Sequence, residues 1–205
     1  MEKNQKICSQ VIAGLVIVIF FACNQTSNKD SDSLEPASTI KISFRYAFKT
    51  KEAKQLSIKA FDLRKVGQFD EAIDFYQKAI IIEHDNPKLF FDMADCYART
   101  NRLNDAIHAL DTAITLDSLY APLYNNRGFY NYKLYNDQDA INDYKKAIEL
   151  DSMRDVYHIN LSLVYYTNKN YSEACDEFRI AVHLGSNLNV YKNQPEFEKL
   201  NELCK

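Results

Sequence analysis

Apolar residues recur along this chain at the spacing of amphipathic helices, and the whole pattern returns every 34 residues. Small residues mark the period in three columns: Ala60, Ala94, Gly128 and Ser162; Ala72, Ala106, Ala140 and Ala174; Ala79, Ala113, Ala147 and Ala181. Larger apolar residues follow each alanine at steps of three and four, which places them in one stripe on a helix. Each unit is therefore predicted to be two helices, joined by a turn, that pack closely at the small residues.

Three stretches of the chain resemble tetratricopeptide repeats: RKVGQFDEAIDFYQKAIIIEHDN, YNNRGFYNYKLYNDQDAINDYKKAIELDS and NKNYSEACDEFRIAVHLGS. The resemblance implies an all-α fold, a right-handed α-α superhelical solenoid of four helix-turn-helix units. The units would cover 53–188, divided as 53–86, 87–120, 121–154 and 155–188. Asn131 and Asp137 stand where the family has apolar residues, so the third unit is expected to pack least tightly.

A further helix is predicted within 189–205. Pro195 suits the first turn of a helix, and Phe197, Leu200 and Leu203 follow it at helical spacing. Running back over the fourth unit, this helix would cap the end of the stack.

The first 22 residues have the pattern of an export signal. Lys3 and Lys6 precede an apolar run at 11–22, which is shorter than the roughly 20 residues that a membrane-spanning helix needs. The run ends at Ala22-Cys23 and resembles a bacterial lipobox, so Cys23 is the expected lipid-attachment residue. We expect an exported lipoprotein, anchored in a membrane of a bacterial cell envelope. Ordinary secretory cleavage and an uncleaved signal anchor are the alternatives.

Residues 23–52 are expected to be a flexible tether followed by a lead-in to the repeats. The part at 24–37 is rich in Ser, Asn and Asp and too poor in apolar side chains to offset the entropy of ordering. The part at 39–50, TIKISFRYAFKT, fits an extended lead-in or an early start of the first helix.

Two cysteines near the C-terminus, Cys175 and Cys204, fall on apolar stripes that the capping helix would bring together. Export to an oxidising compartment favours a disulfide between them, and two separate buried thiols are the alternative. Cys96 lies on the inward stripe of the second unit and is interpreted as a buried apolar residue.

The sequence carries no pattern typical of catalysis, and we predict that the protein is not an enzyme. Its four histidines lack the spacing of a helical zinc site, and its four glycines form no phosphate-binding loop, so neither metal nor cofactor is expected. The net charge of −3 argues against non-specific binding to nucleic acid.

The resemblance implies that the first helix of each unit lines a concave groove for a protein or peptide ligand. The predicted groove residues are Lys54, Phe61, Arg64, Lys65, Lys88, Phe91, Arg99, Asn126, Phe129, Tyr132, Lys133, Asn160 and Tyr166. We therefore expect a non-catalytic, membrane-tethered scaffold for protein–protein interaction. A structural or accessory subunit of an envelope complex, or a homo-oligomer, is the alternative function. Ordinary solvated positions are the alternative for the residues themselves.

Overall fold

The computed structural model describes residues 46–188 and 195–205, which fold into nine α-helices with no strand among them. The predicted signal peptide, Cys23 and the tether at 24–37 lie outside the described residues. Residues 46–50 are not helical, which agrees with an extended lead-in. Within the described part of the chain, no helix is both long and apolar enough to span a membrane.

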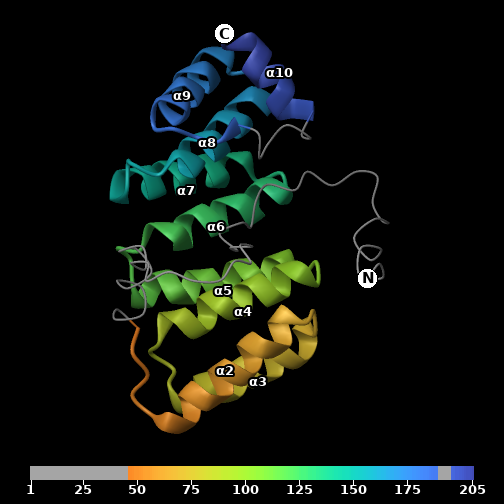
Figure 1. The fold of residues 1–205 in the computed structure, drawn as a ribbon, viewed down its shortest axis with the longest axis vertical. Helices are drawn as coiled ribbons and strands as arrows, with labels where there is room; N and C mark the ends of the chain where they lie inside the picture. The colour runs from red at the N-terminus through yellow and green to blue at the C-terminus, as the bar shows by residue number, and fades with distance from the viewer. Residues whose placement is uncertain (1–45, 189–194) are drawn as a thin grey trace, which may run out of the picture.

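Eight of the helices form four consecutive hairpins, and a ninth follows them. The pairs are α2 (Lys51–Lys65) with α3 (Phe69–Ile82), α4 (Pro87–Arg99) with α5 (Leu103–Leu116), α6 (Ala121–Lys133) with α7 (Asp137–Leu150), and α8 (Asp155–Thr167) with α9 (Tyr171–His183); the last helix is α10 (Pro195–Leu203). Figure 1 shows the hairpins stacked along the long axis of the molecule, with α10 at the end opposite α2 and α3. The predicted all-α solenoid of four helix pairs with a capping helix is confirmed.

The alanine columns lie where helices meet. The alanines of the second column, Ala72, Ala106, Ala140 and Ala174, are fully buried. At Gly128 an added Cβ would lie 3.1 Å from the Cβ of Asp143, so the backbone of α6 approaches α7 more closely than most side chains allow. The small residues thus set the distance between helices, as the sequence predicted.

Each hairpin turns through a residue with a left-handed backbone. These residues share one repeat position: Gly67, Asn101, Tyr135 and Lys169, with φ of 84°, 61°, 61° and 64°. The next residue in each turn donates its backbone N–H to a carbonyl five residues back, as Gln68 does to Leu63 at 3.0 Å. This is the Schellman ending of a helix, which favours glycine or asparagine at the left-handed position. Tyr135 fills that position without the conformational freedom of glycine.

The apolar core is divided near the middle of the stack. One cluster joins the first two units to Leu123 and Tyr130 of α6, and another joins part of α7 to the fourth unit and α10. Polar side chains lie at the division. Arg127 donates to Asp111 at 2.6 Å and to Asp143 at 2.6 Å, and Asn131 donates to Asp143 at 3.2 Å.

Buried polar residues in the third unit are therefore paired with one another. Burial raises the pKa of the Asp143 carboxyl, while the hydrogen bonds from Arg127 act in the opposite direction. Asn131, which breaks the apolar pattern of the family, is itself buried and hydrogen-bonded. Its polar side chain is used in this network.

The N-terminal end of the stack is polar. Gln55, Lys59 and Asp62 of α2 are exposed at the repeat positions where α4 carries the buried Leu89, Met93 and Cys96. The latter residues pack against the preceding unit, and no helical unit precedes α2 within residues 46–188. This polar surface is what keeps the first unit of a solenoid soluble.

Candidate functional site: the first-helix face

The helices α2, α4, α6 and α8 carry the predicted groove residues, and we call the surface formed by these residues and their repeat equivalents the first-helix face. Its exposure decreases along the stack. Lys54, Phe61, Lys65 and Arg99 are exposed; Arg64, Lys88, Phe91, Asn126, Phe129, Tyr132, Lys133 and Tyr166 are partly buried; Asn160 is buried. The structure thus gives the thirteen residues different environments.

The most accessible apolar part of the face lies on α2. Ile58 is 51% exposed and Phe61 is 36% exposed. The Nζ atom of Lys65 lies 4.4 Å from the centroid of the Phe61 ring, and the guanidinium carbon of Arg64 lies 5.1 Å from it. Contacts of this length are within the range of cation–π attraction. A rigid aromatic surface bordered by cations results.

The cations farther along the face are paired with acidic residues of α4. Arg64 contacts Asp95 at 3.0 Å and Asp92 at 3.9 Å, while Lys88 contacts Asp92 at 2.6 Å. Arg99 lies 3.5 Å from Asp95. Burial acts to lower the pKa of the Arg64 guanidinium, but the two carboxylates outweigh it and the pKa is raised.

The pairing largely neutralises the positive charge that the sequence suggests for the N-terminal half. Both aspartates are buried, at 5% and 8% exposure, so their charges lie close to those of Arg64 and Lys88. Lys54 and Lys65 form no salt bridge within 46–188 and 195–205. The remaining positive character therefore belongs to α2.

A series of amide side chains crosses from α6 to α8. Asn125 donates to the side-chain oxygen of Asn126 at 3.2 Å, and Asn160 donates to that of Asn125 at 2.9 Å. The Oδ1 atom of Asn160 is buried and accepts no hydrogen bond in the described structure. A buried acceptor without a donor is costly, so this oxygen is a point where a donor would bind favourably.

The fourth unit corrects one prediction about the face. Asn160 is only 4% exposed, and its neighbours Ile159 and Leu163 are 0% and 3% exposed. They share an apolar cluster with Phe197 and Leu200 of α10. Asn160, whose amide donates to Asn125 of α6, is therefore not an exposed groove residue.

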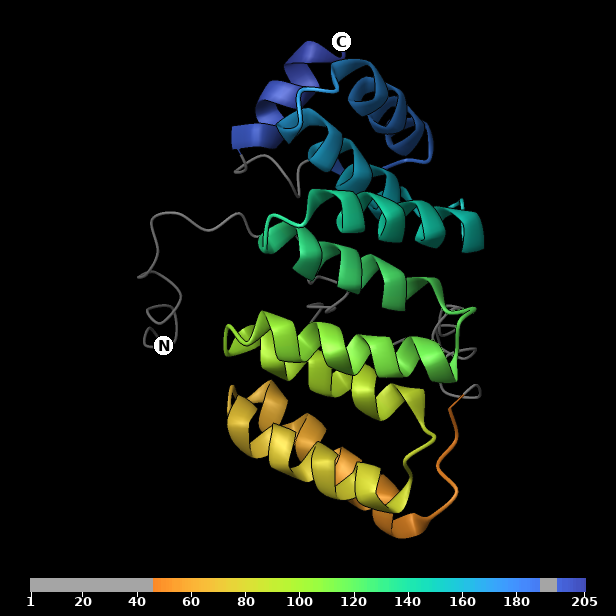
Figure 2. The same ribbon diagram turned by 180° about the vertical axis from the view of Figure 1, so that it is seen from behind.

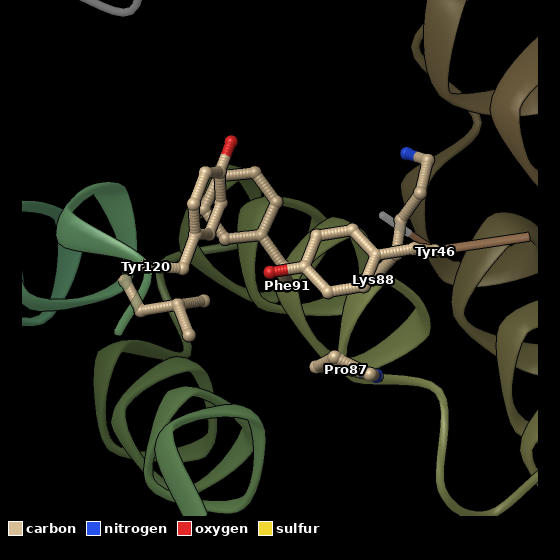
Figure 3. Close-up of a pocket in the computed structure, with 6 residues that line it drawn as sticks. Tyr46, Pro87, Lys88, Phe91 and Tyr120 are labelled. Atoms are coloured by element: carbon tan, nitrogen blue, oxygen red, sulfur yellow. The ribbon is translucent and has the colours of Figure 1, made fainter. Parts of the chain in front are cut away.

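A small pocket opens where the lead-in meets the second and third units. It is lined by Tyr46, Pro87, Lys88, Phe91, Tyr120 and Leu123. Figure 3 shows the rings of Tyr46, Phe91 and Tyr120 gathered around it. The Tyr46 hydroxyl donates to Asp117 at 2.5 Å, and its ring lies 5.7 Å from that of Tyr120. The cavity volume of about 40 Å³ suits one water molecule.

The lead-in is held along the edge of the stack. Thr50 donates to Glu83 through its backbone N–H at 2.6 Å and through its hydroxyl at 2.9 Å, and Lys49 pairs with Asp85. Figure 2 shows this segment running from the start of α2 past the ends of the neighbouring helices. Phe91 therefore borders a segment of the chain itself.

The repeats match a known family model. Residues 63–121 match the model described as tetratricopeptide repeat. The match covers part of the stacked hairpins. The fold is a solenoid of helix pairs like those of tetratricopeptide repeats. A search of curated proteins gave no match.

Several solved structures are similar in fold. A crystal structure of MamA has a TM-score of 0.65 and 22% identity, with 75% of this chain and 85% of that chain covered. PilF of Pseudomonas aeruginosa has a TM-score of 0.61 and 18% identity, covering 75% of each chain. YrrB, described as having an unusual peptide-binding site, has a TM-score of 0.60 and 15% identity, covering 82% of this chain and 91% of that chain. At these identities the likeness shows the fold alone.

Cys96 and His158 carry side-chain groups of kinds that act in catalysis, and both are buried in the solenoid. Burial raises the pKa of the Cys96 thiol to about 12, so the thiol is protonated and unreactive at neutral pH. His158 lies between Glu177, 2.6 Å from Nδ1, and the Ser152 carbonyl, 3.2 Å from Nε2. One unit earlier, Tyr124 donates to the equivalent carbonyl of Ser118 at 3.1 Å. His158 and Tyr124 thus contact the same backbone carbonyl position in the loops before α8 and α6. No group of acidic, histidine or cysteine residues able to hold a metal ion occurs in the described residues.

Sequence reasoning missed two features of this site. It did not anticipate that α4 itself supplies the acids that pair with Arg64, Lys88 and Arg99, although Lys88/Asp92 and Asp95/Arg99 have the i,i+4 spacing of helical ion pairs. It also did not include Tyr46, which reaches Asp117 from 71 residues away and leaves no local pattern.

Proposed function

We propose that this protein is a non-catalytic scaffold that holds a segment of a partner protein against the first-helix face of units 1 to 3. The observation that carries the proposal is the exposed surface of α2. Ile58 and Phe61 are accessible beside Lys54 and Lys65, whereas the other apolar residues of the first-helix face are partly or fully buried. Exposed aromatic and aliphatic side chains bordered by cations are typical of surfaces that bind proteins.

The face favours an extended segment with apolar side chains. Ile58 and Phe61 offer contact area near the first unit, and Asn126 lies in the third unit within the amide series. Amide side chains both donate and accept, so they can bind the backbone of an extended peptide. A peptide-binding site is part of the description of YrrB, which has the same fold, and this adds support.

We further propose that the protein is exported and anchored to a bacterial membrane through lipid on Cys23, with the segment before Tyr46 as its tether. The support comes from the sequence alone: an apolar run of signal-peptide length that ends at Ala22-Cys23. Mass spectrometry of the protein extracted from membranes tests this. We expect a mature N-terminus at Cys23 carrying acyl chains. A mature protein that still contains Cys8 would contradict the lipoprotein assignment.

Site-specific crosslinking tests the binding face. A photoreactive amino acid replaces Phe61 in one variant and Ile81 in a matched control. Ile81 is 81% exposed but lies on α3, outside the first-helix face. We expect one discrete crosslinked partner from position 61 in intact membranes and none from position 81. Equal crosslinking from both positions, or from neither, would argue against this face.

A further inference from the structure

The first-helix face of unit 4 differs from the rest because a helix already lies on it. Ile159 and Leu163 of α8 are buried in one cluster with Phe197 and Leu200 of α10. The rings of Phe197 and Phe178 are 5.6 Å apart, so α10 also contacts α9. In Figure 1, α10 lies against α8 and α9 at the C-terminal end of the stack. The surface therefore accepts an amphipathic helix through an aromatic residue and a leucine three residues later.

Helix α10 is held there by a covalent bond. Cys175 of α9 and Cys204, directly after α10, form a disulfide, with their Cα atoms 5.1 Å apart and a separation of 29 residues. These are the two residues for which the sequence left a disulfide and separate thiols open. Without such a bond, a helix of nine residues is marginally stable on its own.

The fit of α10 to this surface is incomplete. The Oε2 atom of Glu196 is buried and has no hydrogen-bond partner in the described structure. Leaving a buried carboxylate oxygen unpaired disfavours the seated helix. Leu203, in the last turn, is 49% exposed and contributes little. Only Phe197 and Leu200 of this helix are fully buried, so its non-covalent attachment depends on these two side chains.

We propose that the first-helix face of unit 4 is a binding surface for an amphipathic helix of a partner protein, and that α10 occupies it while the Cys175–Cys204 disulfide is intact. A dithiol reductant opens the bond by exchange. One thiolate of the reductant attacks a sulfur of the protein disulfide and forms a mixed disulfide. The second thiol of the reductant then attacks this mixed disulfide, so that the reductant leaves as a cyclic disulfide and both cysteines become thiols. A partner helix with Phe and Leu three residues apart then takes the place of α10. This surface is separate from the one proposed for units 1 to 3.

The size of the effect follows from the loop that the disulfide closes. In the chain-entropy model, opening a loop of about 30 residues raises the population of the detached helix by roughly 100- to 1,000-fold. Detachment exposes Ile159 and Leu163 beside the unpaired oxygen of Asn160. Reduction thus turns an occupied surface into an accessible one.

A peptide added in trans tests the proposal with the purified full chain. The probe is a fluorescein-labelled peptide with the sequence of residues 195–205 and serine at position 204, which prevents disulfide formation. We expect it to bind the dithiothreitol-reduced protein and the Cys204→Ser variant at least tenfold more tightly than the oxidised protein. A peptide with Glu196→Gln should bind several-fold more tightly still, and one with Leu200→Asp should not bind. Equal binding to the oxidised and reduced protein would overturn the proposal.

Two controls separate the proposal from loss of folding and from competition by the attached helix. Hydrogen exchange of the α10 amides should quicken on reduction while α2 to α7 keep their protection; unchanged exchange in α10 would overturn the proposal. A chain with Leu200→Asp has lost the main anchor of its own helix, so its reduced form should bind the peptide most tightly. Crosslinking at position 61 should be unaffected by reduction, which keeps this test independent of the function proposed for units 1 to 3.

Discussion

The two ends of the first-helix face use the same repeat positions in opposite ways. On α2, Ile58 and Phe61 are 51% and 36% exposed, whereas their equivalents on α8, Asn160 and Leu163, are 4% and 3% exposed. No helix of the described residues covers the former, while α10 shares an apolar cluster with Leu163. The repeat pattern fixes which residues belong to the face, and what packs against each unit decides which of them a partner can reach; Asp92 and Asp95, at the same positions of unit 2, are also buried.

The two regions are joined through a part of the stack that is unusually polar. Units 1 and 2 share one apolar cluster, units 3 and 4 contribute to another, and Arg127 lies between them with Asp111 and Asp143. A buried charge is tolerated when it is paired, but the pair adds less than apolar packing of similar volume. The junction is therefore where the solenoid is expected to open first.

The largest effect is expected from breaking this junction. Arg127→Met introduces the residue type that unit 2 has at the equivalent position, Met93. It leaves the buried carboxylate of Asp143 without its cation. We expect a loss of about 3–5 kcal/mol in the free energy of unfolding, measured by urea denaturation. Adding Asp143→Ala, which copies Ala109, should recover most of the loss. A cost below about 1 kcal/mol for the single variant would mean that water reaches these charges.

The next effect concerns the covered end alone. Leu200 is fully buried and Leu203 is 49% exposed on the same helix. Leu200→Ala should lower the stability of the C-terminal region by about 2–4 kcal/mol, whereas Leu203→Ala should cost less than about 0.5 kcal/mol. Hydrogen exchange across α8 to α10 would locate the loss. Similar costs for both variants would contradict the packing of α10 described here.

Interactions between residues close in the sequence, or repeated in every unit, could be predicted, whereas interactions between distant residues could not. The helix pairs and the alanine contacts could be predicted because the residue pattern of each recurs in all four units at the same spacing. The burial of Asn160 could not, because its own repeat position says nothing about the side chains of other helices, such as Asn125 of α6, that pack against it. The Arg64 pairs cross from α2 to α4, and only the i,i+4 pairs of Lys88 and Arg99 leave a local trace.

A moderate effect is expected on partner binding at the open end. Phe61→Ala removes the exposed ring between Arg64 and Lys65 and should weaken partner binding about tenfold, because aromatic residues often dominate interfaces. Stability should change by less than about 0.5 kcal/mol, since the ring is exposed. Ile81→Ala, on α3, is the matched control and should leave binding unchanged. Affinity for the crosslinked partner, measured by biolayer interferometry, checks both. Unchanged binding by Phe61→Ala would remove α2 from the site.

The smallest expected effect compares the turn of unit 1 with that of unit 3. Gly67 and Tyr135 occupy the same left-handed position, yet Tyr135 is 89% exposed and gains little packing for its strained backbone. Tyr135→Gly should therefore raise the free energy of unfolding by about 1 kcal/mol. Gly67→Ala, at a position with φ of 84°, should lower it by a similar amount. Thermal denaturation followed by circular dichroism measures both. If Tyr135→Gly destabilises the protein, the ring must make contacts that its exposure does not show; if it stabilises the protein and weakens partner binding, the strained tyrosine belongs to an interface on the edge of the stack.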